Sequence, residues 1–189
     1  SRKNILYIHA GMPKTGTSAI QRMLANNRKQ LAELGYIYPG THANHWPLVV
    51  GLKDKERMLT NGFVQKTLAE IREWDGDAIL SCEGFSDMGS AKMPAHLTEA
   101  LRACGINHRV VVILYVRRQD DWLDSSYRQR VKSGHSNTFD EFFDDQRSQA
   151  FVIADYLRKA ANWAELIGKD NIVVRPYNRD SWVENNLFA

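Results

Sequence analysis

The sequence predicts an α/β fold: a three-layer sandwich with a mainly parallel central sheet between two layers of helices. Short apolar runs alternate with amphipathic stretches along the chain. The run at 109–117 is rich in β-branched residues, as is typical of a central strand covered on both faces. Strands separated by helices form parallel sheets. Because the chain has 189 residues and is 43% hydrophobic, we expect one core and a single domain over residues 1–189.

The first half of the chain is expected to supply two strands and the helices around them. The apolar run after the N-terminus ends at a glycine, as a buried strand does. Further on, apolar positions fall on one helical face until Gly35 ends that helix. The elements expected here are a strand at 5–10, a helix at 17–34, an irregular segment with one short helix at 39–61, a helix at 63–71 and a strand at 78–84.

The second half is expected to continue the alternation. Pro94 suits the first turn of a helix, where its missing N–H costs nothing. Three phenylalanines close together indicate a short helix, and apolar residues at helical spacing indicate a longer one near the end. The expected elements are a helix that opens at Pro94, a strand at 109–117, a helix at 119–132, a short helix at 139–143, an amphipathic helix at 153–167 and a strand at 171–177.

The segment after the first strand has the glycine spacing of a phosphate-binding loop. Gly11 and Gly16 stand five apart, as in G-x-x-x-x-G-K-[ST], but Thr17 replaces the lysine of that pattern and the nearby lysine is Lys14. Backbone N–H groups and the partial positive charge at the start of a helix attract anions. The alternative is an ordinary strand-to-helix turn. The side chains that add donors to the loop are Lys14, Thr15, Thr17 and Ser18.

A second basic stretch follows the strand at 109–117. Arg117 closes that strand, and Ser125 lies two turns into the helix that follows. An arginine and a hydroxyl facing each other can hold a phosphate. The alternative is an exposed strand end at which Arg117 and Arg118 pair with neighbouring aspartates. In a parallel sheet this stretch and the glycine loop lie at the same edge, where ligands bind.

The two stretches together resemble the donor-binding motifs of sulfotransferases that use 3′-phosphoadenosine 5′-phosphosulfate (PAPS). PKTGTS at 13–18 resembles their 5′-phosphosulfate loop. RRQDDWLDSSY at 117–127 resembles their 3′-phosphate motif, an arginine followed by an aspartate, a serine and often an aromatic residue. Gln119 stands where the family usually has proline, a departure that affects how the following helix starts. The matching residues are Arg117, Asp121, Ser125 and Tyr127.

The resemblance implies a P-loop nucleotide-hydrolase-like fold and an enzyme that moves a sulfuryl group from PAPS to an acceptor hydroxyl, leaving PAP. It implies that Lys14 lies beside the bridging oxygen and neutralises charge as the phosphate departs, and that no metal is needed. Arg117 and Ser125 are implied to hold the 3′ phosphate. PKTGTS lacks the aromatic residue typical of the small-molecule enzymes, so the likeness is closer to the carbohydrate sulfotransferases. The residues implied to hold the 5′ phosphate are Lys14, Thr15, Gly16, Thr17 and Ser18.

The reaction needs a proton acceptor, and three side chains are candidates. Glu83 lies at the end of the strand at 78–84, where the resemblance places a carboxylate base, and a glutamate is ionised at neutral pH. Its alternative role is to cap a turn or pair with a cation. His42 and His45 can line the acceptor site or act as the base instead. Arg130 can hold an acidic acceptor, although a solvated helix face is its ordinary role.

Two other functions stay open on the sequence alone: a P-loop kinase acting on a nucleotide or small molecule, and a non-catalytic homologue that binds nucleotide or glycan. The net charge of +3 does not favour a nucleic-acid partner, and no apolar run reaches membrane-spanning length. Two cysteines favour a reducing, cytoplasmic location, unless a targeting or anchor segment has been removed. The family usually has another basic, glycine-containing loop near its C-terminus, so we expect a C-terminal portion to be missing here.

Overall fold

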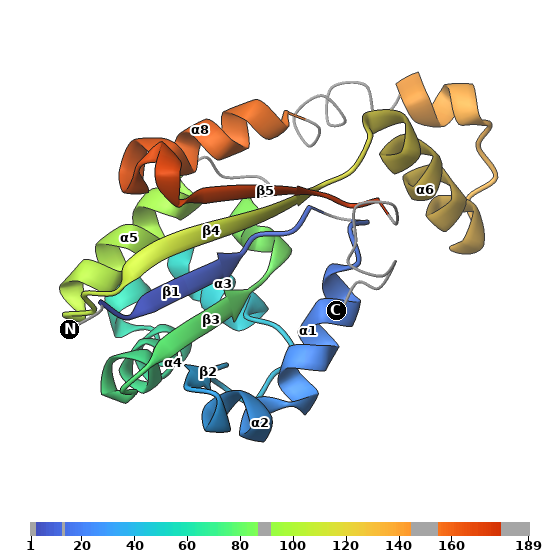
Figure 1. The fold of residues 1–189 in the computed structure, drawn as a ribbon. Coiled ribbons are helices and arrows are strands. Elements are labelled where there is room, and N and C mark those ends of the chain that lie inside the picture. The colour runs from blue at the N-terminus through green and yellow to red at the C-terminus, as the bar shows by residue number, and fades with distance from the viewer. Residues whose placement is uncertain (1–2, 13, 87–91, 145–154, 179–189) are drawn as a thin grey trace.

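A five-stranded parallel sheet organises the residues that the computed structural model describes, which are 3–12, 14–86, 92–144 and 155–178 (Figure 1). The strands lie in the order β2-β3-β1-β4-β5, and every neighbouring pair is parallel. The predicted α/β class is therefore confirmed. The sequence analysis misses β2, because two residues are too few to show a periodicity. The strands are β1 (Ile5–His9), β2 (Tyr36–Ile37), β3 (Asp77–Ser81), β4 (Arg109–Val116) and β5 (Ile172–Pro176).

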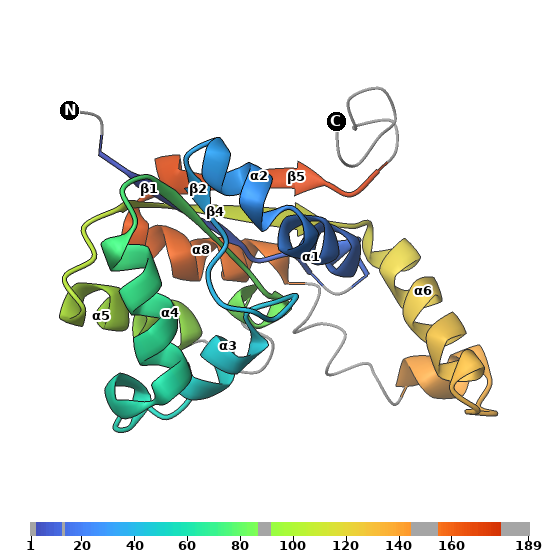
Figure 2. The same ribbon diagram turned by 90° about the horizontal axis from the view of Figure 1, so that it is seen from below.

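Helices cover both faces of the sheet. Figure 2 shows α1 and α2 on one side and α3, α4, α5 and α8 on the other, while α6 extends away from the sheet. None of the described helices is long and apolar enough to span a membrane. The helices are α1 (Thr17–Asn26), α2 (Arg28–Glu33), α3 (Trp46–Leu52), α4 (Gly62–Glu73), α5 (Met93–Ala103), α6 (Gln119–Lys132) and α8 (Tyr156–Ile167). Residues 139–144 are also helical, and the 3-10 turns are η1 (Met58–Thr60), η2 (Glu83–Ser86) and η3 (Lys169–Asn171).

The two faces of the sheet differ in what they bury. Leu6 and Ile8 of β1 point to one face and are inaccessible to solvent. They belong to the main core, which also contains buried side chains of β3, β4, α3, α4, α5 and α8. Residues of β1 at odd positions point to the other face, because side chains alternate along a strand. This second face buries the polar pair His9 and Ser81 next to the loop that follows β1.

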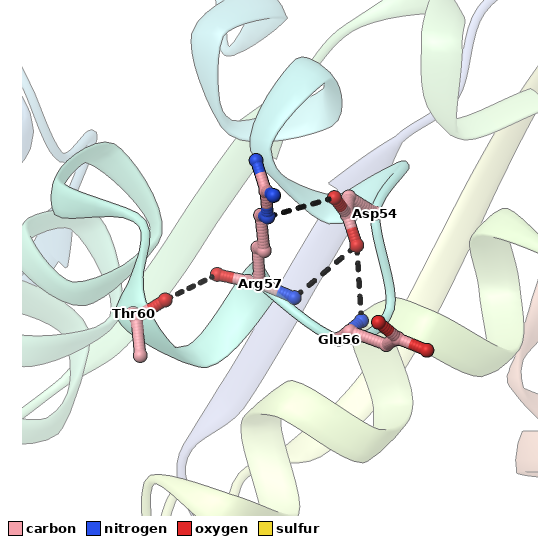
Figure 3. Close-up of polar contacts among 4 residues, drawn as sticks. All are labelled: Asp54, Glu56, Arg57 and Thr60. Carbon is pink, nitrogen blue, oxygen red and sulfur yellow. Dashed lines mark hydrogen bonds and ion pairs between the residues drawn. The ribbon is translucent and has the colours of Figure 1, made fainter.

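The connection from α3 to α4 is built by side chains that bond to nearby backbone. One carboxylate oxygen of Asp54 accepts from the N–H groups of Glu56 and Arg57, an Asx turn, and the Thr60 hydroxyl donates to the Arg57 carbonyl (Figure 3). The Asn61 side chain then accepts from the N–H groups of two residues in the first turn of α4. These bonds explain why the turn-rich segment 39–61 holds α3 and η1 but no long helix.

Two expected helices differ from the structure in their extent or in the side they bury. The helix expected over 17–34 is interrupted at Asn27, whose side-chain amide donates to the Met23 carbonyl, so α1 and α2 are separate. Leu34 is 72% exposed and Leu157 on α8 is 83% exposed, so neither side chain belongs to the buried side of its helix. Lys159 and Trp163 are the buried positions of α8 instead. Ile153, the expected start of that helix, lies outside the described residues.

We predict that Asn61→Ala lowers the free energy of unfolding by about 1 kcal/mol, because two N–H groups at the start of α4 lose their acceptor. Asn61→Asp is the matched control, since a carboxylate oxygen can accept the same bonds. Chemical denaturation of the three proteins measures the difference. Equal stability of wild type and Asn61→Ala would contradict a capping role for this side chain.

Candidate functional site

The loop after β1 remains attached to the sheet through its first residues. The Ala10 N–H donates to the Ile113 carbonyl, and the Met12 N–H donates to the Tyr115 carbonyl at 3.3 Å. On the other side of β1, the Cys82 N–H donates to the His9 carbonyl. The C-terminal ends of β1, β3 and β4 therefore lie at one edge of the sheet, where α1 begins (Figure 1).

The backbone of the loop takes up a strained conformation. Lys14 has φ +68° and Gly16 has φ +70°, both in the left-handed region, which costs a lysine about 1 kcal/mol or more. Gly11 has no room for a side chain: a Cβ there would lie 2.2 Å from Cγ2 of Thr17 and 2.9 Å from Nε2 of His9. The first-turn N–H groups of α1 face a glycine N-cap, which has no side chain to accept from them. This arrangement leaves donors for an external anion.

Two of the three loop hydroxyls already donate within the protein. Thr15, which is buried, donates to the Met12 carbonyl at 2.6 Å and closes the loop on itself. Thr17 donates to Oε1 of Glu83 at 2.5 Å. Ser18 is exposed at the start of α1. A hydroxyl has only one proton to donate, so in this structure Ser18 is the loop hydroxyl best placed to serve an anion, alongside Lys14 and the backbone.

Glu83 is held at both carboxylate oxygens by α1. Besides the bond from Thr17, Oε2 accepts from the side-chain amide of Gln21 at 3.2 Å. Gln21 is only 3% exposed, so this amide is a fixed part of the site rather than a surface group. The half-buried Glu83 therefore has a defined orientation beside the loop, in the η2 turn that follows β3.

The turn that carries Glu83 is fixed from the other side by α8. The buried ammonium of Lys159 donates to the Ser86 carbonyl at 2.8 Å, and the indole of Trp163 donates to the Phe85 carbonyl at 3.0 Å. The Ser86 hydroxyl donates back to the Glu83 carbonyl. Both η2 and Glu83 are thereby connected to the core, to which the buried Trp163 belongs.

Arg117 reaches the loop directly. Its Nη1 donates to the Lys14 carbonyl at 3.2 Å, and its guanidinium lies 6.0 Å from the centre of the Tyr177 ring. Tyr156 at the start of α8 donates its hydroxyl to the Arg117 carbonyl at 2.7 Å. Arg118 instead pairs with Asp120 on the exposed surface. The alternative of a solvent-exposed ion pair thus applies to Arg118, whereas the Arg117 side chain bonds to the loop after β1.

The electrostatics of the loop favour an anion. Partial burial, and secondarily the like charge of Arg117, lower the pKa of Lys14. The two cations destabilise each other, and an anion between them would relieve that repulsion. Such a pair of cations at a helix N-terminus is the chemistry of a site for phosphate or sulfate.

The four remaining predicted residues lie on α6 or in the segment between β2 and α3. Ser125 is half-buried on α6, two turns after Arg117. His45 is buried: its Nδ1 accepts from the Ser81 N–H and its Nε2 bonds to the Pro39 carbonyl, so its contacts connect β3 to the segment after β2. His42 is exposed and packs against the ring of Phe63. Arg130 lines an open pocket together with Lys14.

Sequence reasoning misses two groups of residues in this region. Gln21 lies one turn after Thr17, so the i, i+4 spacing is the signal that places both side chains on one face of α1. The other group lines the open pocket next to Lys14 and flanks Arg130, which the sequence analysis already names. These residues are Ser126 and Gln129 on α6, with Ser133 at its C-cap and His135 after the helix.

Comparison with known proteins gives the class of fold. No family model matches the chain. The structure is similar to that of a sulfotransferase from Alicyclobacillus acidocaldarius, with a TM-score of 0.56 and 14% identity over 94% of this chain and 74% of that one. The protein therefore has a sulfotransferase-like α/β fold of the P-loop-like type, as predicted.

A curated relative is similar over a shorter stretch. A segment of 77 residues, 41% of this chain, is 36% identical to an uncharacterised protein of Archaeoglobus fulgidus and spans 20% of its length. Because that relative is uncharacterised, the likeness indicates no activity for this chain.

We predict that the protein becomes less stable as the pH is lowered, because the buried His9 is protonated more readily in the unfolded chain than in the folded protein. Burial lowers the pKa of His9 from 6.5 to about 4, against the opposing effect of Glu83. The unfolded chain thus binds a proton that the folded protein does not, and stability is lost as the pH falls from 6.5 toward 4. In His9→Asn the slope of unfolding free energy against pH should decrease by about 1 kcal/mol per pH unit.

Denaturant unfolding at several pH values measures this slope. His135→Asn, a change at an exposed position, is the control and should leave the slope as in wild type. His45, whose pKa burial also lowers to about 4, keeps part of the slope in the His9 variant. An unchanged slope in His9→Asn would mean that His9 is protonated equally in both states.

Proposed function

We propose that the protein is a PAPS-dependent sulfotransferase whose acceptor is a carbohydrate hydroxyl. The observation that carries this proposal is the 3.2 Å bond from the Arg117 guanidinium to the Lys14 carbonyl. It joins the two stretches that resemble the 5′ and 3′ motifs, so one adenosine-based donor can contact both. Glu83 reaches the same loop through Thr17.

The reaction assigns a separate task to each group. The acceptor oxygen attacks the donor sulfur, and the bond from sulfur to the bridging oxygen of the phosphate breaks. Glu83 takes the hydroxyl proton, since a carboxylate offers about four lone-pair sites and Thr17 and Gln21 occupy two of them. Lys14 stabilises the negative charge that develops on the departing PAP, an effect of a few kcal/mol in a dry site.

The donor is held by groups around the loop. The N–H groups at the start of α1, with Ser18 and Lys14, bind the 5′ phosphate. Arg117, whose backbone carbonyl accepts from the Tyr156 hydroxyl, binds the 3′ phosphate together with Ser125. Thr15 and Thr17 support these contacts: Thr15 holds the loop closed, and Thr17 links it to Glu83.

We predict that the protein binds 3′,5′-adenosine bisphosphate (PAP) at least about tenfold more tightly than ATP with Mg²⁺. Arg117→Ala should remove most of this preference, because a charged hydrogen bond to the 3′ phosphate is worth about 1.5–3 kcal/mol. Arg118→Ala is the matched control, since Arg118 is exposed and paired with Asp120. Titration calorimetry gives both affinities. A preference for ATP with Mg²⁺ would indicate a kinase instead.

We predict that Glu83→Gln lowers the rate of sulfate transfer from PAPS by about 10²–10⁴-fold, because the amide cannot take the acceptor proton. PAP affinity should stay within about threefold of wild type, which separates catalysis from binding. Glu56→Gln, on the exposed turn of Figure 3, is the control. The assay follows transfer of labelled sulfate from PAPS to a panel of saccharides. Full activity of Glu83→Gln would exclude Glu83 as the base and would favour His42 as the proton acceptor.

A further inference from the structure

We infer that the loop after β1 binds its anion together with a proton, which His9 takes up on the inner side of the loop. The ligand is a divalent anion, a sulfate or a phosphate monoester, and the proton is carried by Nε2 of the imidazole. This inference rests on the part of the proposed function that places an anion in the loop, and not on the transfer of sulfate. The observation that carries it is a buried nitrogen atom for which the described residues provide no hydrogen-bond partner.

His9 lies on the polar face of the sheet and is almost completely buried. The residue is 4% exposed, and its Nε2 atom has no hydrogen-bond partner among the described residues. Because nearly all buried polar atoms in proteins have a partner, such an exception requires a reason. Nε2 lies against the loop, since a Cβ on Gly11 would be 2.9 Å from it. The unpartnered atom is therefore at the boundary between the sheet and the loop, where a ligand can influence it.

A chain of hydrogen bonds identifies the ring nitrogen that carries the hydrogen. The Tyr38 hydroxyl donates to the Ala43 carbonyl at 2.9 Å, so in the side-chain hydrogen bond that it shares with Ser81 its oxygen accepts. Ser81 thus donates its one proton to Tyr38, and its Oγ accepts from Nδ1 of His9 at 2.7 Å. In a neutral imidazole the other nitrogen then has a lone pair. His9 therefore presents an unused proton acceptor to the loop.

The groups around His9 explain why it is neutral in this structure. Burial lowers the pKa of His9 to about 4, and the negative charge of Glu83 opposes this effect only in part. The tyrosines and the cysteine nearby are uncharged at neutral pH, and α1 contributes the uncharged Thr17. The titratable groups on the elements around the ring and loop are Glu83 in η2, Tyr115 on β4, Cys82 after β3, Tyr38 after β2, and Lys14 and Arg117 at the loop.

An anion in the loop changes this balance. At the effective dielectric constant of a protein, a dianion within about 10 Å of the ring raises its proton affinity by about 10²-fold. The charge of Glu83 acts in the same direction. Because linkage is reciprocal, the imidazolium in turn strengthens the binding of the anion by the same factor. His9 thus contributes charge to the anion without touching it.

A histidine suits this position because its charge appears only with the ligand. Lys14 and Arg117 already repel each other, and partial burial together with this repulsion lowers the pKa of Lys14. A third permanent cation beside the loop would add to that cost. His9 stays neutral until an anion is present, so it provides a third positive charge only when two negative charges compensate it.

The test measures the protonation of His9 directly, by nitrogen-15 NMR of the imidazole side chains at pH 5 to 7. Inorganic sulfate is the first probe, because its charge does not change in this range, and PAP is the second. Without a ligand we expect His9 to be neutral throughout, with its hydrogen on Nδ1. With saturating sulfate its proton affinity should rise by about 10²-fold. Calorimetry should then show that sulfate binds about tenfold more tightly at pH 5 than at pH 7.

Two variants assign the effect to His9. His9→Asn should remove the signals in question and most of the pH dependence of sulfate binding. His108→Asn is the matched control: this half-buried histidine precedes β4 at the opposite edge of the sheet, bonds to the Gly76 carbonyl at 3.3 Å, and should be unaffected by sulfate. Thermal unfolding shows whether each variant is folded. Should His9→Asn fail to fold, the nitrogen signals of the wild type decide alone.

The outcomes separate this inference from the proposed function. If sulfate or PAP binds while the proton affinity of His9 changes less than about threefold, the inference is overturned and the proposed function survives. A ligand-free His9 with its hydrogen on Nε2 would overturn the inference as well. If sulfate binds and protonates His9 but PAP does not bind, the proposed function fails and the inference stands. If neither anion binds, both fail.

Discussion

The central position of β1 in the parallel sheet is the constraint on which the site depends. Because β1 pairs with β3 on one side and β4 on the other, the chain segments that leave these three strands meet at one edge. Backbone hydrogen bonds continue past the strands themselves, from Met12 to Tyr115 and from Cys82 to His9, and so fix where each segment turns. Glu83 and Arg117 come from strands that never touch each other, yet both reach the one loop that lies between them.

This arrangement carries three local costs in free energy. Lys14 has a left-handed backbone conformation, two cations repel each other across the loop, and the Nε2 atom of His9 is buried without a hydrogen-bond partner in the described structure. Each feature costs free energy that the rest of the protein supplies, through the apolar core on the opposite face of β1 and the two bonds by which α8 holds the Glu83 turn. An anion in the loop would relieve the repulsion directly. The repulsion between Lys14 and Arg117 is therefore a cost that a bound anion can remove.

The sequence predicts the sheet and the edge at which the site lies, because both depend on patterns that repeat over several residues. The run at 109–117 is such a pattern, and so is the glycine spacing that leads into α1. The sequence does not predict the break between α1 and α2 at Asn27, where the side-chain amide donates to the Met23 carbonyl. It also does not predict that Gln21 and His45 are buried. These features depend on single partners far away in the sequence: Glu83 for Gln21, and Ser81 for His45. Propensity and periodicity carry no information about such partners.

The contact between Thr17 and Glu83 gives a physical reason for the unusual place of the lysine. In the G-x-x-x-x-G-K-[ST] pattern a lysine would stand at position 17, where Oγ1 of the threonine lies 2.5 Å from the carboxylate of Glu83. An ammonium at that point would form an ion pair with Glu83 and reduce its ability to accept a proton. Moving the lysine to position 14 places its backbone beside Arg117 and its side chain at the open pocket that Arg130 also lines. In the proposed reaction the cation that serves the leaving phosphate and the carboxylate that serves the acceptor then remain separate, and a neutral hydroxyl keeps the carboxylate oriented without neutralising it.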